Sequence, residues 1–188
     1  YCAKKITGLP ENQVFGSGTV LDTARMRYLI SLETGTAVQN IHGYIAGEHG
    51  DSEVPLWSST EIGGVPITQW GTTLDGGVFD ETKRERIAHD VVRSAYRIIE
   101  GKGATNYAVG LAVQRIIGAV LNDEQRVLTI SPLLDGWHGI SDVCMAVPTI
   151  VGREGAGRRL ELPLTSEEKE RLTASADHLR EVARGLGY

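Results

Sequence analysis

The chain has 188 residues, of which 41% are hydrophobic and 23% charged, and its formal net charge is −5 at pH 7. This length suits one domain with a sizeable core, since a domain of about 150 residues buries roughly 70% of its unfolded surface. No apolar run approaches the roughly 20 residues that cross a bilayer, and the acidic balance offers no electrostatic footprint for nucleic acid. We therefore expect a single domain over residues 1–188 whose ligands are small molecules.

The amino terminus and the cysteines give no sign of secretion. No apolar segment followed by small residues, as in a signal peptide, opens the chain. Cys2 and Cys144 lie far apart and lack the spacing of a redox or metal-binding pair. We therefore expect reduced thiols, no metal site and a cytoplasmic protein.

The first 35 residues read as a helix followed by a strand, a turn and a second helix. The opening residues have helical composition and end at Gly8 and Pro10, which commonly follow a helix. Val14-Phe15 is a short apolar run before the turn Gly16-Ser17-Gly18. Apolar residues at helical spacing then predict a helix that begins at Leu21 or Asp22 and ends at Gly35.

Residues 38–67 are richer in strand-forming residues. Two strands are expected on either side of the glycine-rich segment Gly47-Glu48-His49-Gly50-Asp51. A hairpin with a Gly63-Gly64 turn follows, and Pro66 predicts that its second strand lies at a sheet edge, because proline cannot donate a ladder hydrogen bond.

The remaining sequence predicts three helices and several antiparallel strands. Asp80 and Thr105 are suited to cap two consecutive helices, which are separated by Gly101-Lys102-Gly103. The segment Thr165-Ser166-Glu167-Glu168 is a capping box for the last helix. Strands are expected in the apolar, β-branched runs of the interval between these helices, at 127–130, 143–151 and near Leu160.

These elements predict an α+β fold, with a mixed or antiparallel sheet packed by long helices. A complete dinucleotide-binding fold is not expected within these residues. Gly16-Ser17-Gly18 lacks the third glycine of the usual fingerprint, and no acidic residue follows at the end of a second strand.

Two groups of residues could carry chemistry. His49 lies between glycines, where the chain can bend and expose an imidazole suited to proton transfer near neutral pH, although a surface histidine in a turn fits equally well. Asp22 and Arg25 would share a helix face, and the arginine could hold a planar carboxylate with two hydrogen bonds. The alternative is a surface ion pair that contributes only about 0.3–0.5 kcal/mol.

Three segments in order and spacing resemble the L-lactate dehydrogenases. They are Gly16 to Leu29, Gly47 to Ser52 and Gly101 to Ala108. The similarity extends over essentially the whole chain, including Ser141-Asp142-Val143-Cys144, and corresponds to the carboxyl-terminal, catalytic domain of bacterial members. It implies interconversion of pyruvate and (S)-lactate, with NAD as the cofactor.

The resemblance also implies roles for individual residues. His49 would be the acid/base, and Arg25 would bind the substrate carboxylate. Asp22 would fix the tautomer of the His49 imidazole and stabilise its charged form. Thr105 would line the substrate pocket, while Ser17 and Val109 would lie near the nicotinamide end of NAD. Thr23 and Val109 depart mildly from the commoner serine and isoleucine, with little expected consequence.

Arg27 and His42 match positions that help bind fructose 1,6-bisphosphate at a subunit interface in bacterial members. Arginine and histidine are chemically suited to phosphate. An allosteric site is therefore a further expectation, alongside the alternative that these residues serve packing or the interface.

In the family, the nucleotide-binding domain, the mobile loop with a second arginine and a substrate-binding asparagine all precede the segment matched here. We therefore expect weak NADH binding and slow turnover by this chain alone, and association into a homodimer or tetramer through exposed apolar surface. A malate dehydrogenase of related type and a non-catalytic folding or assembly module are the alternative functions.

Overall fold

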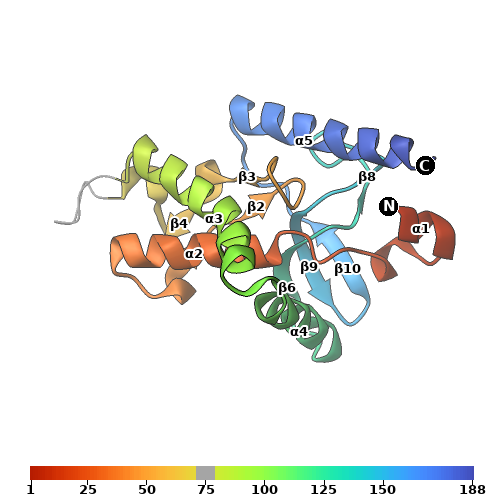
Figure 1. Cartoon of the computed structure of the whole chain (residues 1–188), viewed down its shortest axis with the longest axis horizontal. Coiled ribbons are helices and arrows are strands. Elements are labelled where there is room, and N and C mark those ends of the chain that lie inside the picture. Colours follow the sequence, from red (N-terminus) through yellow and green to blue (C-terminus); the bar gives the residue numbers. More distant parts are fainter. Residues whose placement is uncertain (71–78) are drawn as a thin grey trace.

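The computed structural model describes residues 1–70 and 79–188, and its helices enclose a small antiparallel sheet. Figure 1 shows α5 (Ser166–Gly185) along one side of the molecule and α4 (Tyr107–Leu121) on the opposite side. Between them lie β6 (Arg126–Ile130), β9 (Val147–Gly152) and β10 (Gly155–Arg159), in the order β10-β9-β6. The expected α+β fold is confirmed.

The strand pairs among the described residues are antiparallel, but two strand boundaries differ from the prediction. The apolar run 143–151 divides into β8 (Val143–Cys144), which pairs with β7 (Leu133–Leu134), and β9. The strand expected near Leu160 ends at Arg159. The Leu160 amide still donates to the carbonyl of Pro148, so the chain continues beside β9 without a regular ladder.

Two short strands flank the glycine-rich loop, as predicted. β2 (Ile45–Ala46) pairs with β3 (Val54–Pro55), with Ala46 opposite Val54. Gly47 exchanges two backbone hydrogen bonds of 2.9 and 3.0 Å with Ala146. This bridge fixes the start of the loop against the entry to β9.

The predicted hairpin is also confirmed. β4 (Glu61–Ile62) and β5 (Val65–Pro66) pair across the glycine turn, and β1 (Ile41–His42) adds to β4. The order β1-β4-β5 places Pro66 on an edge strand. Short 3-10 helices connect the elements at Glu11–Gln13, Val38–Asn40, Trp57–Ser59 and Ile67–Gln69.

Most helix ends follow the capping chemistry of the sequence, but the helix predicted to begin at Leu21 or Asp22 begins at Val20. Asp80 accepts a hydrogen bond from the Lys83 amide at the start of α3 (Glu81–Lys102), and Thr165 and Glu168 form the capping box of α5. The prediction that Thr105 caps α4 is wrong, because the Asn106 side chain accepts from the Tyr107 amide. The first helix, α1 (Cys2–Thr7), ends at Gly8 in a left-handed conformation.

In the described part of the chain, the core consists of three groups of buried side chains, and α2 (Val20–Thr34) contributes to two of them. Met26 and Ile30 are fully buried against β1, β2 and α3. Val20 instead packs with α4 and the sheet β10-β9-β6. The third group lies beneath α5, where Leu172 and Ala176 are fully buried. Burial of an aliphatic side chain of this size contributes roughly 1.5–3 kcal/mol.

The start of α2 is held directly against β6. The strand predicted at Val14-Phe15 is not formed; instead Gly16 and Ser131 form an isolated bridge with two hydrogen bonds of 3.0 Å. Gly18 has a φ of +56°, and a Cβ at this position would lie 2.3 Å from the carbonyl oxygen of Thr129. Glycine therefore permits both the turn and the close approach, which set where α2 begins.

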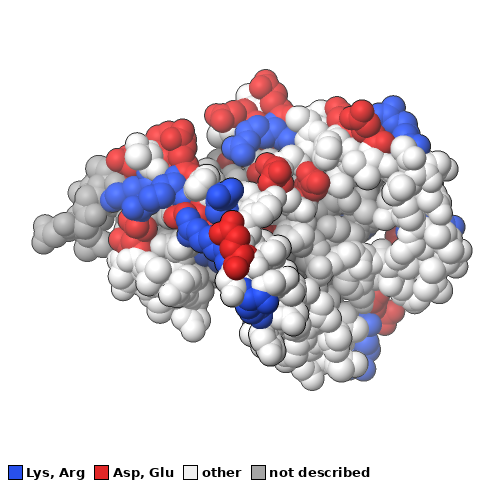
Figure 2. Space-filling model, in the orientation of Figure 1, with Lys and Arg blue, Asp and Glu red and all other residues white. Residues whose placement is uncertain are grey.

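The surface of α4 carries few charges (Figure 2). The exposed apolar side chains on this helix are Tyr107, Val109, Leu111, Val113, Ile117 and Leu121. Among the described helices, none combines the length and the apolar character that crossing a membrane would require. The exposed apolar side chains of α4 form a candidate surface for contact with another protein.

Gly18→Ala is expected to lower the free energy of unfolding by about 2–5 kcal/mol. The left-handed conformation alone costs an L-residue roughly 1–2 kcal/mol, and the steric overlap with Thr129 adds about 1–3 kcal/mol. Gly35→Ala is the matched control, because Gly35 has a φ of +66° and open space around it. Urea unfolding measures both, and equal losses would contradict the role of the close approach.

Candidate active site

A buried carboxylate at the start of α2 is the centre of the candidate site. Asp22 is 2% exposed and lies in the first turn of the helix. Its Oδ2 is 2.6 Å from Nδ1 of His49, and its Oδ1 accepts a 3.0 Å hydrogen bond from Nη1 of Arg25. The structure thus brings together three of the residues singled out in the sequence.

The loop that carries His49 is held in place by α5. Gly47 has a φ of +99°, and a Cβ there would lie 2.9 Å from Oγ of Ser175. The hydroxyl of Ser175 accepts a 2.8 Å hydrogen bond from the Glu48 amide and lies 3.0 Å from the hydroxyl of Ser52. Sequence reasoning did not identify Ser175, because a serine within a helix gives no signal of a contact 127 residues away.

The contact with Asp22 raises the pKa of the His49 imidazole above its ordinary value of 6.5, and partial burial opposes that rise. The charged form is favoured because the carboxylate lies against Nδ1. The His49 side chain is 57% exposed, so its ring remains accessible. Since Nδ1 faces Asp22, Nε2 is the nitrogen that can exchange a proton with a ligand.

The three residues line a cavity of about 240 Å³. The opposite wall comes from α3, through Val92, Ala95, Tyr96 and Ile99. Each water molecule occupies about 30 Å³ in the liquid, so the cavity has room for a small molecule. A cationic arginine, a protonatable imidazole and an apolar wall suit a small organic acid.

Glu53 is a further member of this site that sequence reasoning missed. It is 5% exposed and lines the same cavity. One polar atom each from Asp22, His49 and Glu53 lie within 4.8 Å of one another. The only signal in the sequence was a carboxylate directly before the apolar pair Val54-Pro55, which is too common to single out.

Thr105, Ser17 and Val109 do not line the cavity beside His49 in the described part of the chain. Thr105 is half-buried in the connection between α3 and α4, and Val109 is 40% exposed on the first turn of α4. Ser17 is exposed in the turn before α2. These three residues border other surfaces of the molecule.

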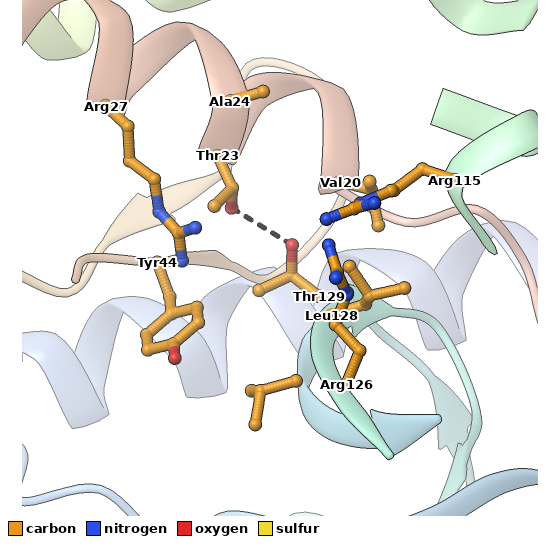
Figure 3. Close-up of a pocket in the computed structure, with 10 residues that line it drawn as sticks. Val20, Thr23, Ala24, Arg27, Tyr44, Arg115, Arg126, Leu128 and Thr129 are labelled. Atoms are coloured by element: carbon orange, nitrogen blue, oxygen red, sulfur yellow. Dashed lines mark hydrogen bonds between the residues drawn. The ribbon is translucent and has the colours of Figure 1, made fainter. Parts of the chain in front are cut away.

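Arg27 lies at a second cavity, also of about 240 Å³ (Figure 3). Its Nε donates a 2.9 Å hydrogen bond to the Gly43 carbonyl, and its guanidinium lies 5.0 Å from the centre of the Tyr44 ring. Arg115 and Arg126 extend into the same cavity from α4 and β6. Sequence reasoning missed both because they come from distant segments.

His42 is exposed on β1 and does not line this second cavity in the described chain. Burial lowers the pKa of Arg27, and Tyr44 opposes that effect. The structure therefore groups Arg27 with two other arginines rather than with the expected histidine.

Comparison with known proteins gives a match over residues 19–185 to the family described as lactate/malate dehydrogenase, alpha/beta C-terminal domain. An L-lactate dehydrogenase of Bifidobacterium animalis subsp. lactis is 50% identical over 188 residues, which are 100% of this chain and 59% of that protein. An L-lactate dehydrogenase of Thermoanaerobacter sp. is 49% identical over 99% of this chain and 60% of its own length.

Solved structures give the same result. The minor L-lactate dehydrogenase of Enterococcus mundtii, in its ligand-bound form, has a TM-score of 0.90 and 40% identity over 95% of this chain and 56% of that one. A lactate dehydrogenase from a Medee basin deep-sea metagenome has a TM-score of 0.94 and 39% identity, over 99% and 59%. The chain thus spans about three-fifths of the length of these relatives.

Asp22→Asn is expected to lower the pKa of His49, since the carboxylate is the largest cause of its rise. The folded-state pKa exceeds the unfolded value, so the stability from this contact is full below pH 6.5 and lost as pH rises through the folded-state pKa. The substitution should abolish this pH-dependent contribution to the free energy of unfolding. NMR titration of the imidazole measures the pKa.

Asp177→Asn on α5 is the matched control, because it removes the same charge from an exposed pair with Arg180. The control should leave the His49 titration unchanged. An unaltered His49 pKa in the Asp22 variant would contradict the electrostatic account.

Proposed function

The chain belongs to the lactate/malate dehydrogenase family, and from that membership we propose that it is the catalytic, substrate-binding part of an NAD-dependent L-lactate dehydrogenase. The observation that carries the proposal is the arrangement of His49, Asp22 and Arg25 around one cavity. Reduction of a 2-oxo acid requires a cation for its carboxylate and a proton for its carbonyl oxygen. These residues can supply both.

His49 is the proposed acid/base. Its Nε2 would donate a proton to the oxygen of the 2-oxo acid as the alkoxide develops, and would take it back in the reverse direction. Asp22 would keep Nδ1 protonated and would stabilise the imidazolium, since it contacts Nδ1 at 2.6 Å. The raised pKa of His49 favours the charged, proton-donating form of its ring.

Arg25 is the proposed binder of the substrate carboxylate. Only its Nη1 is used by Asp22, so further N–H groups of the fork are available at the cavity. Its side chain is 14% exposed, and partial exclusion of water strengthens a charge-assisted hydrogen bond. Thr105 is proposed to border the bound substrate from the connection between α3 and α4.

NAD would supply the hydride acceptor or donor. Ser17 and Val109 are proposed to contact its nicotinamide end, and they fit that role chemically. Ser17 offers an exposed hydroxyl, and Val109 offers an apolar surface that is 40% exposed. The other contacts to NAD would lie in the two-fifths of the relatives that this chain does not span. We therefore propose that the chain alone binds NADH weakly and reduces pyruvate slowly.

Lactate is favoured over malate because the relatives compared above are named lactate dehydrogenases. A non-catalytic folding or assembly module is the alternative from another functional class, and the ordered contacts of Asp22 argue against it. The exposed apolar side chains of α4 support assembly into a homodimer or tetramer. The proposed location is the cytoplasm.

Oxamate, a planar analogue of the 2-oxo acid, is expected to bind this chain and to shift the His49 imidazole signals in NMR. Arg25→Lys should weaken that binding about tenfold or more, because an ammonium cannot reproduce the bidentate hydrogen bonds, each worth roughly 1.5–3 kcal/mol. Arg184→Lys, on the last turn of α5, is the matched control and should bind as the wild type does. The absence of any shift at saturating oxamate would favour the non-catalytic module.

The second cavity supports a separate, allosteric proposal. Arg27, Arg115 and Arg126 line it together, whereas only Arg126 has a carboxylate partner among the described residues, Glu124 at 2.7 Å. This excess of positive charge favours a phosphate such as those of fructose 1,6-bisphosphate. His42 lies on β1, outside this cavity. It would contribute to the proposed site only through a ligand, or a second copy of the chain, that extends from the cavity to β1.

Arg27→Gln and Arg115→Gln are each expected to weaken binding of fructose 1,6-bisphosphate about tenfold, since each removes a charge-assisted contact. Isothermal titration calorimetry measures the change, with Arg184→Gln as the control. His42→Gln tests whether the sugar phosphate binds beside His42 on β1 or among the arginines of the second cavity. A loss with His42→Gln but not with Arg115→Gln would assign the sugar phosphate to the β1 side instead.

A further inference from the structure

Glu53 is a buried carboxyl group that the proposed reaction does not use. It lies directly before β3, four residues after His49, and is 5% exposed. Its Oε1 is buried and has no hydrogen-bond partner among the described residues. An ionised carboxylate without a partner is far more costly in such a place than the neutral acid.

The neighbouring Asp22 decides which of the two carboxyl groups carries the charge. Atoms of Asp22, His49 and Glu53 lie within 4.8 Å of one another, and two carboxylates at this spacing repel each other strongly when both are ionised. Oδ1 of Asp22 accepts a hydrogen bond from Arg25, and Oδ2 lies 2.6 Å from Nδ1 of His49 as an ion pair, although like Oε1 of Glu53 it has no hydrogen bond of regular geometry within the described chain. Glu53 has no comparable contact among the described residues, so Asp22 keeps the charge and Glu53 keeps the proton.

Among the described residues, the charged groups that face Glu53 come from α2 and from the loop that carries His49. They are Asp22 and Arg25 on α2, and His49 and Asp51 in the loop. From α3 the cavity wall is apolar except for Tyr96, whose hydroxyl lies 3.4 Å from Oδ1 of Asp51. Burial first, and then Asp22, raise the pKa of Glu53 to about 8, while His49 and Arg25 oppose the rise.

We propose that Glu53 is a positioning residue whose neutral carboxyl group leaves the imidazolium of His49 facing one carboxylate charge instead of two. A second negative charge beside the ring would hold the proton of His49 more strongly and would make it a poorer donor. Glu53 lines the cavity, and the effect proposed for it is exerted through the charge of the His49 ring. The catalytic consequence rests on the proposed function, but the protonation of Glu53 does not.

The two groups are expected to titrate as a coupled pair. When Glu53 loses its proton, its new charge favours the imidazolium, and the pKa of His49 rises. The His49 titration should therefore be broader than that of an isolated histidine. Removing the carboxyl group should sharpen it and move its midpoint to lower pH.

The test is an NMR titration of this chain from pH 4 to pH 10, following the Glu53 side-chain carboxyl carbon and the His49 ring nitrogens. The carboxyl signal is expected to titrate near pH 8, and Glu53→Gln should give a single-step His49 curve with a lower midpoint. Glu48→Gln is the matched control, because Glu48 lies in the same loop and its carboxylate accepts a hydrogen bond from Ser52. The control should retain the broad curve.

A carboxyl midpoint near 4.5, or superimposable His49 curves in the wild type and the Glu53 variant, would overturn the proposal. Neither outcome would bear on oxamate binding, so failure here is distinguishable from failure of the proposed function. The wild-type carboxyl titration needs no substitution and therefore does not depend on the folding of a variant.

Stability gives an independent readout. The folded-state pKa of Glu53 lies above its unfolded value of 4.5, so its contribution is full below pH 4.5 and is lost as pH rises towards 8. The Glu53→Gln variant has no proton to lose at this position, so it does not lose this stability as the pH rises. Its urea midpoint should therefore rise relative to the wild type between pH 4.5 and pH 8, and a constant difference over that interval would contradict a protonated Glu53.

Discussion

The arrangement of the site depends on the burial of one charge. The carboxylate of Asp22 is almost completely removed from solvent, and it is tolerated there because each oxygen has a cationic or protonatable neighbour, Arg25 on one side and His49 on the other. Removing either neighbour would leave part of the charge uncompensated. The same burial orients the imidazole and the guanidinium towards one cavity, so the requirement for charge neutralisation also positions the functional groups.

The position of Asp22 depends in turn on how α2 begins. Gly18 allows close contact with β6, the Thr19 hydroxyl donates a 2.6 Å hydrogen bond to the Ile45 carbonyl, and Thr23 contacts Thr129 at 3.0 Å. These buried contacts connect the helix to β2 and β6 at once. Because the His49 loop starts from β2, the acid and the imidazole are fixed relative to the same strand.

A single helix therefore serves two cavities. Residues three or four apart on α2 share a face. Asp22 and Arg25 point to the site with His49, whereas Thr23 and Arg27 point to the arginine-lined cavity (Figure 3). The hydroxyl pair of Thr23 and Thr129 lies on that second face. The two cavities therefore share α2 as a wall.

The sequence by itself determined the fold class and most helix ends, because caps and glycine turns are local properties of the chain. The grouping of His49, Asp22 and Arg25 in one site came from the resemblance of three long motifs to the family, since the residue pattern alone left a surface histidine and a surface ion pair open. Tertiary structure alone decided that α4 is capped by Asn106, that Val14-Phe15 forms no strand, and that Ser175 holds the His49 loop. It also decided the environment of Glu53 and the meeting of Arg27 with Arg115 and Arg126. Those features depend on burial and on contacts between distant segments, and neither is encoded in any short stretch of residues.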